Sequence, residues 1–172
     1  MRHKDRLSYI HHVYSFLVIT SLIAFDQGTK YLVRANMFLG ESICVIPEFF
    51  NLVYVMNPGG AFGLWAGKSN FFRMFFFFII GIVAIVILII IYFDPSYGLL
   101  THIGIVLLLG GACGNIIDRI RWRMVVDFLD FYWRSFHWPA FNVADTAISI
   151  GMALFLLELW FDYRKKAKEK RG

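Results

Sequence analysis

Long apolar runs separated by short polar segments form the main pattern of this chain. The longest uncharged run is Met74 to Phe93, with twenty residues, and Leu99 to Ile117 and Ala140 to Phe161 are of similar length. A helix needs about 20 mainly apolar residues to cross the hydrocarbon of a bilayer. Each of these three runs therefore predicts a membrane-spanning helix.

A shorter apolar run, Val13 to Phe25, lies near the N-terminus. It reaches crossing length only if the helix starts near residue 11 and includes Asp26 and Lys30. The basic start resembles a signal peptide, but no small-residue cleavage site follows the run, so we expect it to be retained as a first span. The predicted fold is therefore membrane all-α, with four transmembrane helices at approximately 11–30, 74–93, 99–117 and 140–161 in a single integral membrane domain, 1–172.

Two longer segments, 31–73 and 118–139, separate these spans. Each contains a short stretch rich in Val, Tyr and Phe, Phe50 to Met56 and Met124 to Phe131, which is typical of β-strands. We expect a small extracytoplasmic β-sheet that lies on the membrane surface. The link from Asp94 to Gly98 contains Pro95 and predicts a tight hairpin between the second and third spans.

Composition and charge support residence in a membrane. The chain is 59% hydrophobic and 17% charged, whereas a soluble domain is about 45–50% apolar and about 25% charged. The net charge of +5 comes largely from the two ends, and the tail 164–171 holds six basic residues. This distribution excludes a nucleic-acid-binding face and fits anionic lipid headgroups beside cytoplasmic termini.

The polar residues inside or beside the spans show a second pattern. In an up-and-down arrangement, the ends of spans one and three and the starts of spans two and four lie on the same side. The polar residues at that side are Asp26, Lys30, Asn115, Asp118, Arg119, Asn142 and Asp145, and the connecting segments add Asn57 and Asp127. The sequence therefore predicts one polar rim, whichever way the protein is inserted.

Asp145 is the most unusual member of this rim. It lies about five residues inside the fourth predicted span, which is about 7 Å at 1.5 Å per residue. A charge at the centre of a span costs about 2.5–3.5 kcal/mol, and less near its end. A carboxylate kept at this depth requires a partner or a function.

Several of the rim residues also have purely structural interpretations. Asp26 and Lys30 stand at i and i+4 with the acid first, which favours an ion pair. Gly110 and Gly114 form a Gly-xxx-Gly motif that favours close helix contact. Asn115, Asp118 and Arg119 share one helix face and are either a stop signal or a set of ligand contacts, and Asn142 could cap the fourth helix.

The remaining candidates are weaker on their own. Asp127 and Asp130 lie in an apolar stretch and would more often be surface residues. The segment Asn57 to Gly63 is a turn by composition, which could also let the backbone approach a ligand. Neither the five histidines nor the two cysteines have metal-ligand spacing, so we expect no metal and no cofactor.

The chemistry that these residues could perform involves paired carboxylates. We find no plausible catalytic Ser-His or Cys-His pairing and no phosphate-binding loop. Two carboxylates brought together share a proton, so that one activates a water while the other polarises a carbonyl or protonates a leaving amine. Spacing alone does not show which acids pair, and Asp118, Asp127, Asp130 and Asp145 are all eligible.

Five sequence pieces, in order across nearly the whole chain, resemble the lipoprotein signal peptidase family, also called signal peptidase II. The pieces are Asp26-Gln27-Gly28-Thr29-Lys30, Asn57-Pro58-Gly59-Gly60-Ala61-Phe62, Gly110-Gly111-Ala112-Cys113-Gly114-Asn115-Ile116-Ile117-Asp118-Arg119, Val125-Val126-Asp127-Phe128 and Phe141-Asn142-Val143-Ala144-Asp145-Thr146. Each piece alone is weak, whereas five in this order on a four-span chain of this length are specific.

The resemblance implies a membrane aspartyl peptidase whose catalytic dyad is Asp127 and Asp145. It implies that Asn57 and Arg119 contact the substrate backbone and that Asn115 and Asn142 orient the dyad or the substrate. It leaves Asp118 a supporting role, and we expect a structural role for Asp26, Lys30, Gly59, Gly111 and Gly114.

The implied substrate is a diacylglyceryl-modified prolipoprotein, cut just before the lipidated Cys. The implied location is the bacterial cytoplasmic (inner) membrane, with both termini cytoplasmic and the active site near the extracytoplasmic face. The expected partners are this substrate and membrane lipids, without nucleic acid, and the expected state is a monomer.

Two other functions fit parts of the sequence. A small four-span transporter or channel could bind cations with the rim acids, but it would need ionisable residues along a path to both faces. The opposite rim offers little beyond Asp94, Glu158 and Asp162. A non-enzymatic scaffold would not need the acids of the rim at all.

Overall fold

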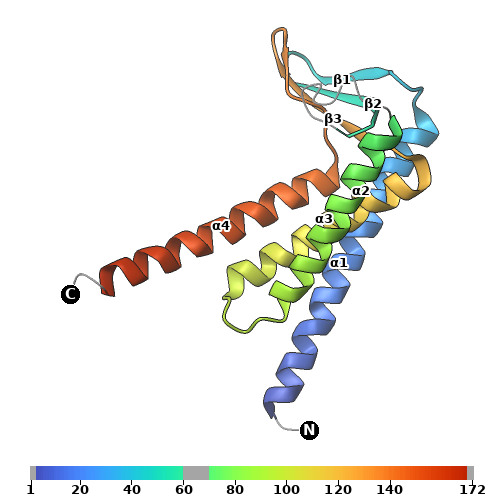
Figure 1. Ribbon diagram of the computed structural model, residues 1–172. Coiled ribbons are helices and arrows are strands. Elements are labelled where there is room, and N and C mark those ends of the chain that lie inside the picture. Colours follow the sequence, from blue (N-terminus) through green and yellow to red (C-terminus); the bar gives the residue numbers. More distant parts are fainter. Residues whose placement is uncertain (1–2, 60–69, 170–172) are drawn as a thin grey trace.

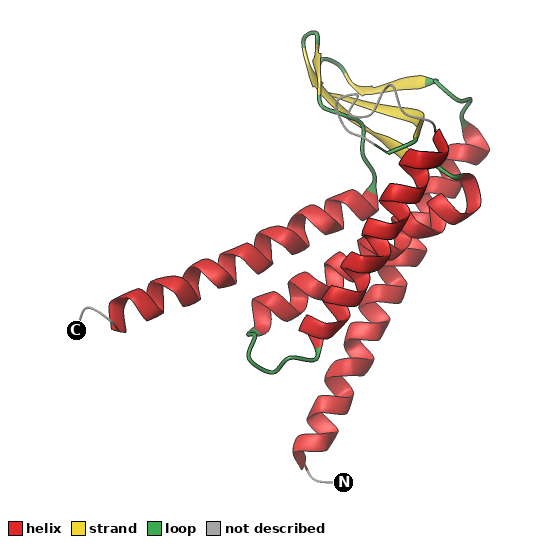
Figure 2. Cartoon of the chain, viewed as in Figure 1, coloured by secondary structure: helices red, strands yellow, loops and turns green. Residues whose placement is uncertain are grey.

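The computed structural model describes residues 3–59 and 70–169. This part of the chain forms four long helices and a four-stranded antiparallel sheet at one end of them (Figures 1 and 2). The elements in chain order are α1 (His3–Asn36), β1 (Ser42–Ile46), β2 (Phe50–Asn57), α2 (Asn70–Tyr92), α3 (Leu99–Trp122), β3 (Val125–Trp133), β4 (Phe136–His137) and α4 (Val143–Glu169). The start of α1 and the end of α4 both lie away from the sheet.

Three of the described helices have segments long and apolar enough to cross a membrane. These segments are Phe75–Tyr92, Leu99–Trp122 and Val143–Glu169, and they correspond to the three long apolar runs of the sequence. Helix α1 has 34 residues, about 50 Å at 1.5 Å per residue, but polar side chains interrupt its apolar stretch. Its crossing of the membrane remains a prediction.

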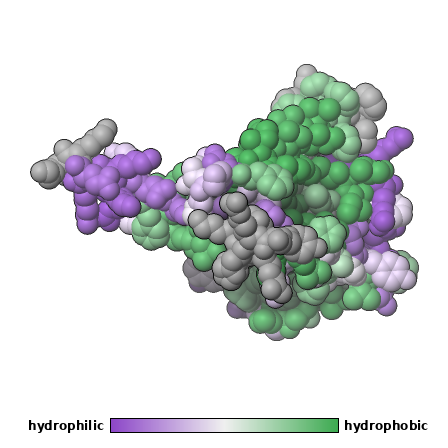
Figure 3. Space-filling model, turned by 90° about the horizontal axis from the view of Figure 1, so that it is seen from below, coloured by the Kyte–Doolittle hydropathy of each residue, from purple (hydrophilic) through white to green (hydrophobic). Residues whose placement is uncertain are grey.

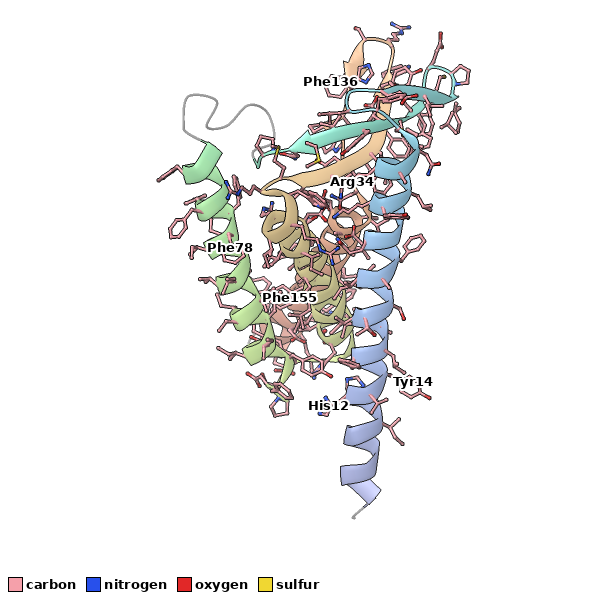
Figure 4. The ribbon with its side chains drawn as sticks, turned by 90° about the vertical axis from the view of Figure 1, so that its right-hand side faces the viewer. His12, Tyr14, Arg34, Phe78, Phe136 and Phe155 are labelled. Atoms are coloured by element: carbon pink, nitrogen blue, oxygen red, sulfur yellow. The ribbon has the colours of Figure 1, made fainter. Side chains whose placement is uncertain are left out.

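The outward surfaces of the helices are strongly apolar. Tyr14 on α1 is 65% exposed and points away from the neighbouring helices (Figure 4), and Ile90 on α2 is 66% exposed. Figure 3 shows continuous hydrophobic surface over the helices and a hydrophilic extension formed by the basic end of α4. Such surfaces are stable when lipid covers them and the charged end reaches the headgroups.

The sheet has the strand order β1-β2-β3-β4. The two predicted strands are present as β2 and β3, which pair antiparallel with Val55 opposite Asp127 and Asn51 opposite Asp130. Strand β1, of five residues, and strand β4, of only two, were not predicted. The inner side of β3 packs on the end of α1, where Val126 and Phe128 contact Val33 and Met37.

Helix α4 begins three residues later than the predicted span. The preceding segment is held by the sheet instead, since Phe141 and Leu129 exchange backbone hydrogen bonds of 3.1 and 2.9 Å. The helix therefore starts at Val143, and Asp145 lies in its first turn rather than about five residues inside the span.

Glycines let α3 approach the helices on either side of it. A Cβ atom on Gly104 would lie 2.6 Å from the carbonyl oxygen of Gly151, and a Cβ on Gly111 would clash with the backbone of Ala144, both on α4. On the side facing α1, a Cβ on Gly110 would lie 2.6 Å from Leu22. The predicted close approach at Gly110 is present, and the Gly104–Gly151 contact adds a second one that the sequence did not reveal.

We expect Gly104→Val to destabilise the protein by about 1–3 kcal/mol, because the added atoms must displace the backbone of α4. Thermal unfolding of purified protein in detergent measures this change. Gly28→Ala on α1 is the matched control, since a Cβ there meets no atom within 4 Å. An unfolding midpoint for Gly104→Val equal to that of the unmodified protein would contradict the close packing.

Candidate active site

The structure gathers the polar rim residues into one connected cluster beneath the sheet. Asp26 and Lys30 lie toward the C-terminal end of α1, Asn115 and Asp118 toward the end of α3, and Asp127 on β3, while Asn142 directly precedes α4. All six are buried. Hydrogen bonds and ion pairs link them to Asp145, so residues far apart in the sequence form one site.

Asn142 and Asp145 form a reciprocal cap at the start of α4. The backbone N–H of Asp145 donates to Asn142 Oδ1 at 2.9 Å, and the backbone N–H of Asn142 donates to Asp145 Oδ2 at 3.3 Å. This arrangement is a capping box, in which two otherwise unpaired N–H groups are satisfied by side chains three residues apart. The cap predicted for Asn142 is therefore present, and it fixes the carboxylate of Asp145.

The same Asn142 side chain also binds the second carboxylate. Its Nδ2 donates to Asp127 Oδ1 at 2.7 Å, while Asn57 Nδ2 donates to Asp127 Oδ2 at 2.8 Å. One residue thus contacts both acids, through its side chain to Asp127 and through its backbone to Asp145. Asp127 and Asp145 are held side by side at the junction of β3 and α4.

Asn115 supports Asp145 from α3. Its Nδ2 donates to Asp145 Oδ1 at 2.8 Å, and its Oδ1 accepts from Lys30 Nζ at 3.1 Å. Because a lysine can only donate, this contact fixes which end of the amide faces Asp145. Lys30 therefore determines the orientation of the donor that Asp145 receives.

Lys30 is itself the centre of a buried ionic group. Its Nζ lies 2.9 Å from Asp26 Oδ2 and 2.9 Å from Asp118 Oδ2. The other oxygen of Asp26 accepts from the backbone of Ala144 at 2.9 Å, and Asp118 Oδ2 accepts from the backbone of Val126 at 3.1 Å. The group therefore anchors the residues adjacent to Asp127 and Asp145 in the chain.

Gln27 is a member of this cluster for which sequence analysis gave no role. Its Nε2 donates to Asp118 Oδ1 at 2.9 Å and to the carbonyl of Gly114 at 3.1 Å. The feature of the sequence that could have indicated a role for Gln27 is its position directly after Asp26, at the polar end of α1. The contact ties α1 to α3 beside the ionic group.

Burial changes the protonation of Asp127, which lies on β3 outside the apolar helices. Loss of solvent raises the pKa of Asp127 to about 7, and the nearby charge of Asp145 acts in the same direction. Hydrogen bonds from Asn57 and Asn142 oppose this rise but do not cancel it. Asp127 therefore holds its proton up to near-neutral pH.

Two cavities open beside Asp145. The first, of about 520 Å³, lies between α2, α3 and α4, and among the described residues its polar lining consists of Asn115, Arg119 and Asp145. The second, of about 500 Å³, lies between α4 and the segment 138–141, and Asn57 also lines it. Arg119 reaches the first cavity with one guanidinium nitrogen 3.4 Å from the carbonyl of Asn115.

Asp130 does not join this cluster. Its carboxylate lies 3.0 Å from His137 Nδ1 and accepts from Asn51 Nδ2 at 3.0 Å, within the sheet. Asp118 is bound in the ionic group. Of the four eligible acids, Asp127 and Asp145 are thus the pair bridged by Asn142.

The predicted turn and the histidines lie outside this polar cluster. Gly59 ends the described part of the turn with φ +93, and its N–H donates to Asn57 Oδ1 at 2.9 Å. Gly60, Ala61, Phe62 and Gly63 of the predicted turn lie outside the described residues. His11, His12 and His102 lie at the far end of the helices from the sheet, where the ring centroids of His11 and His102 are 5.6 Å apart.

Fold and site together define an integral membrane protein with a pair of carboxylates, Asp127 buried and Asp145 half-buried, at one end of its apolar helices. The family model described as signal peptidase (SPase) II matches residues 18–161. The chain belongs to the signal peptidase II family, and it is therefore a membrane peptidase.

Individual relatives agree with this assignment. The chain is 52% identical to the lipoprotein signal peptidase of Desulforapulum autotrophicum, over 85% of this chain and 91% of that protein. It is 46% identical to the lipoprotein signal peptidase of Syntrophus aciditrophicus, over 90% of this chain and 95% of that protein. A solved structure described as a bacterial membrane enzyme superposes with a TM-score of 0.78 at 38% identity, covering 89% of this chain and 91% of that one.

Proposed function

We propose that this protein is an aspartyl endopeptidase that removes the signal peptide from diacylglyceryl-modified prolipoproteins, cutting just before the lipidated Cys. The observation that carries the proposal is the pair of acids, Asp127 and Asp145, bridged by Asn142 at the end of an apolar cavity. The substrate class follows from the lipoprotein signal peptidases that the chain is similar to.

The first cavity suits the signal peptide. Its walls are aliphatic and aromatic side chains of α2, α3 and α4, and Phe155 is the described lining residue farthest along α4 from Asp145. Figure 4 shows Phe155 among the helices. A helical signal peptide satisfies its own backbone hydrogen bonds and needs no polar wall. Such a helix can enter from the lipid and bring its C-terminal end to Asp145.

We assign the shared proton of the dyad to Asp127 and the role of base to Asp145. Asp145 takes a proton from water, whose oxygen attacks the carbonyl carbon of the residue before the Cys, while Asp127 donates its hydrogen bond to the carbonyl oxygen. The tetrahedral intermediate then collapses, the C–N bond breaks, and the proton passes from Asp145 to the departing amine of the Cys. Both acids return to their starting states.

Arg119 and Asn57 are placed to hold the peptide beside the dyad. Arg119 makes one long hydrogen bond to the carbonyl of Asn115, so its other N–H groups can donate to substrate carbonyls. Asn57 lines the second cavity while donating to Asp127. We assign both residues to substrate binding, with Asn57 also supporting the dyad.

The same proposal orients the protein. We place both termini in the cytoplasm of a bacterial cell, α1 as a fourth crossing of the inner membrane, and the sheet on the extracytoplasmic surface. The basic end of α4 then faces anionic lipids of the inner leaflet. Every residue of the dyad cluster comes from one chain, so a monomer forming a single domain is sufficient for activity.

Cleavage of a synthetic precursor tests the function. Purified protein in detergent is incubated with a signal-peptide precursor carrying a diacylglyceryl Cys, and with the same peptide unmodified, and the products are identified by mass spectrometry. We expect cleavage only of the lipidated peptide, at the bond before the Cys, and equal rates with and without EDTA. Cleavage elsewhere, or inhibition by EDTA, would overturn the proposed mechanism.

The activity should depend on pH in a defined direction. Asp127 is protonated below about pH 7 and ionised above it, so the dyad loses its proton, and the enzyme its activity, as the pH rises through about 7. Asn57→Ala removes a donor that stabilises the ionised form, so this variant should lose activity at a higher pH than the unmodified enzyme. The pH dependence of kcat measures both effects, and a shift to lower pH in Asn57→Ala would contradict the assignment.

A further inference from the structure

The two cavities beside Asp145 lie on opposite flanks of the same helix. A helix turns about 100° per residue, so Ile148 and Met152 lie on one flank of Asp145, while Thr146 and Ile150 lie on the other. The first pair lines the cavity shared with α2 and α3, and the second pair lines the cavity under segment 138–141. Within the part of the chain that the structure describes, Asp145 is the residue that lines both.

The two cavities differ in chemistry. Away from its Asp145 end, the described lining residues of the first cavity are Phe, Ile, Gly, Ala, Leu and Met, whose side chains carry no hydrogen-bond donor and no hydroxyl group. The second contains the hydroxyl groups of Thr146 and Ser149. The Thr146 hydroxyl is used, because it donates to the carbonyl of Asn142 at 2.9 Å. The exposed Ser149 hydroxyl has no hydrogen-bond partner within residues 3–59 and 70–169.

A substrate cleaved beside Asp145 has two parts, one on each side of the scissile bond, which we call the signal-peptide arm and the lipid arm. The two arms require different surroundings. The signal-peptide arm is an apolar helix whose backbone is already paired. The lipid arm carries two ester carbonyls beside apolar chains, and an ester carbonyl buried without a donor loses its hydrogen bond to water. The second cavity is partly polar and is lined in part by the exposed Ile150 of α4, so it suits the lipid arm better than the first cavity does.

Resting on the proposed function, we infer that α4 separates the two arms of the substrate: the first cavity holds the signal peptide and the second holds the glyceryl ester group of the lipidated Cys, with the Ser149 hydroxyl donating to an ester carbonyl. The second cavity, of about 500 Å³, has the size of a small-molecule site. It holds the ester-bearing end of the lipid, and the acyl chains continue into the bilayer beside the exposed Ile150.

The hydrogen bond from Ser149 can be tested separately by removing the ester carbonyl groups from the substrate. Ser149→Ala is assayed with a diacylglyceryl precursor and with a dialkylglyceryl ether precursor, which lacks the ester carbonyls. We expect KM for the diacyl substrate to rise about two- to tenfold, as the loss of one hydrogen bond predicts. For the ether substrate we expect KM to stay unchanged, and for both substrates kcat to stay unchanged. Ser149→Thr, which keeps a hydroxyl, should restore the KM.

Product inhibition tests the assignment of the arms. Ile150→Trp should fill the second cavity and weaken inhibition by a diacylglyceryl-cysteine amide at least fivefold, while inhibition by the free signal peptide stays unchanged. Met152→Trp should fill the first cavity and give the reverse pattern. For the Ser149→Ala assays, the matched control is Thr20→Ala, which also removes a hydroxyl group. Thr20 on α1 bonds only the backbone of its own helix.

The outcomes separate this inference from the proposed function. Equal effects of Ser149→Ala on the diacyl and ether substrates would overturn the hydrogen bond, and the reversed inhibition pattern would overturn the assignment of the arms. In both cases, normal cleavage by the unmodified enzyme would leave the peptidase function standing. If the unmodified enzyme cleaves neither precursor, the proposed function itself fails.

Discussion

Asp127→Asn should reduce cleavage of the lipidated precursor by at least about 10²–10⁴-fold, which is the usual contribution of a positioned acid or base. The amide has the shape of the carboxyl group and still accepts a hydrogen bond at its oxygen. It cannot hold and release the proton that the dyad shares. Asp145→Asn should have an effect of the same size, because Asp145 must take a proton from the attacking water.

Single-turnover kinetics in detergent measure this loss, and thermal unfolding shows whether each variant is folded. Asp130→Asn is the matched control. Asp130 is a buried acid on the same strand as Asp127, but it binds Asn51 and His137 rather than the dyad. Its variant should keep most of the activity. Full activity in either dyad variant, or complete loss in Asp130→Asn, would contradict the assignment.

Lys30→Met should be the most destabilising single change in the cluster. Lys30 lies within 2.9 Å of both Asp26 and Asp118 and is 2% exposed. Its removal leaves two buried carboxylates facing each other without a cation, and breaking a buried ion pair in this way costs about 3–5 kcal/mol. For a chain of this length the thermal midpoint should fall by roughly 6–20 °C.

Thermal unfolding in detergent checks this expectation, with Lys165→Met as a control that removes an exposed lysine from the tail. The triple variant Lys30→Met, Asp26→Asn, Asp118→Asn removes the opposing charges together and should recover part of the lost stability. A midpoint for Lys30→Met within two degrees of the unmodified protein would show that the ionic group does not hold the site together.

The sequence predicted the main parts of the fold and the site for clear physical reasons. Apolar runs of span length could only be buried helices or lipid-facing ones, so α2, α3 and α4 were recognisable. Because successive spans run in opposite directions, the sequence predicted that Asp26, Asn115 and Asp145 lie at the same end of the helices, without any knowledge of how the helices pack. The i, i+3 spacing of Asn142 and Asp145 predicted a cap, which the structure contains.

Other features depend on contacts between distant residues, which spacing does not reveal. The bond from Asn142 to Asp127 needs β3 and the start of α4 to be adjacent. The later start of α4 follows from the pairing of Phe141 with Leu129, a single bridge outside any recognisable strand. The Gly104–Gly151 contact joins two glycines on different helices, neither of which belongs to a motif. Pairing of Asp130 with His137 likewise appears only once β3 and β4 form a hairpin.

The glycine contacts between α3 and α4 also determine which wall of the first cavity can move. Gly104 and Gly151 hold α4 against α3 by backbone contact, and Glu158 of α4 accepts a hydrogen bond from the backbone of Thr101 near the start of α3. Helix α2 is held differently: along its length it packs mainly on α3, and at its last residue the Tyr92 hydroxyl lies 2.8 Å from His12 Nδ1 on α1. The first cavity therefore has two fixed walls, α3 and α4, and one wall that can move, α2. Signal peptides of different girth would be accommodated by displacement of α2, while the carboxylates on β3 and α4 keep their spacing.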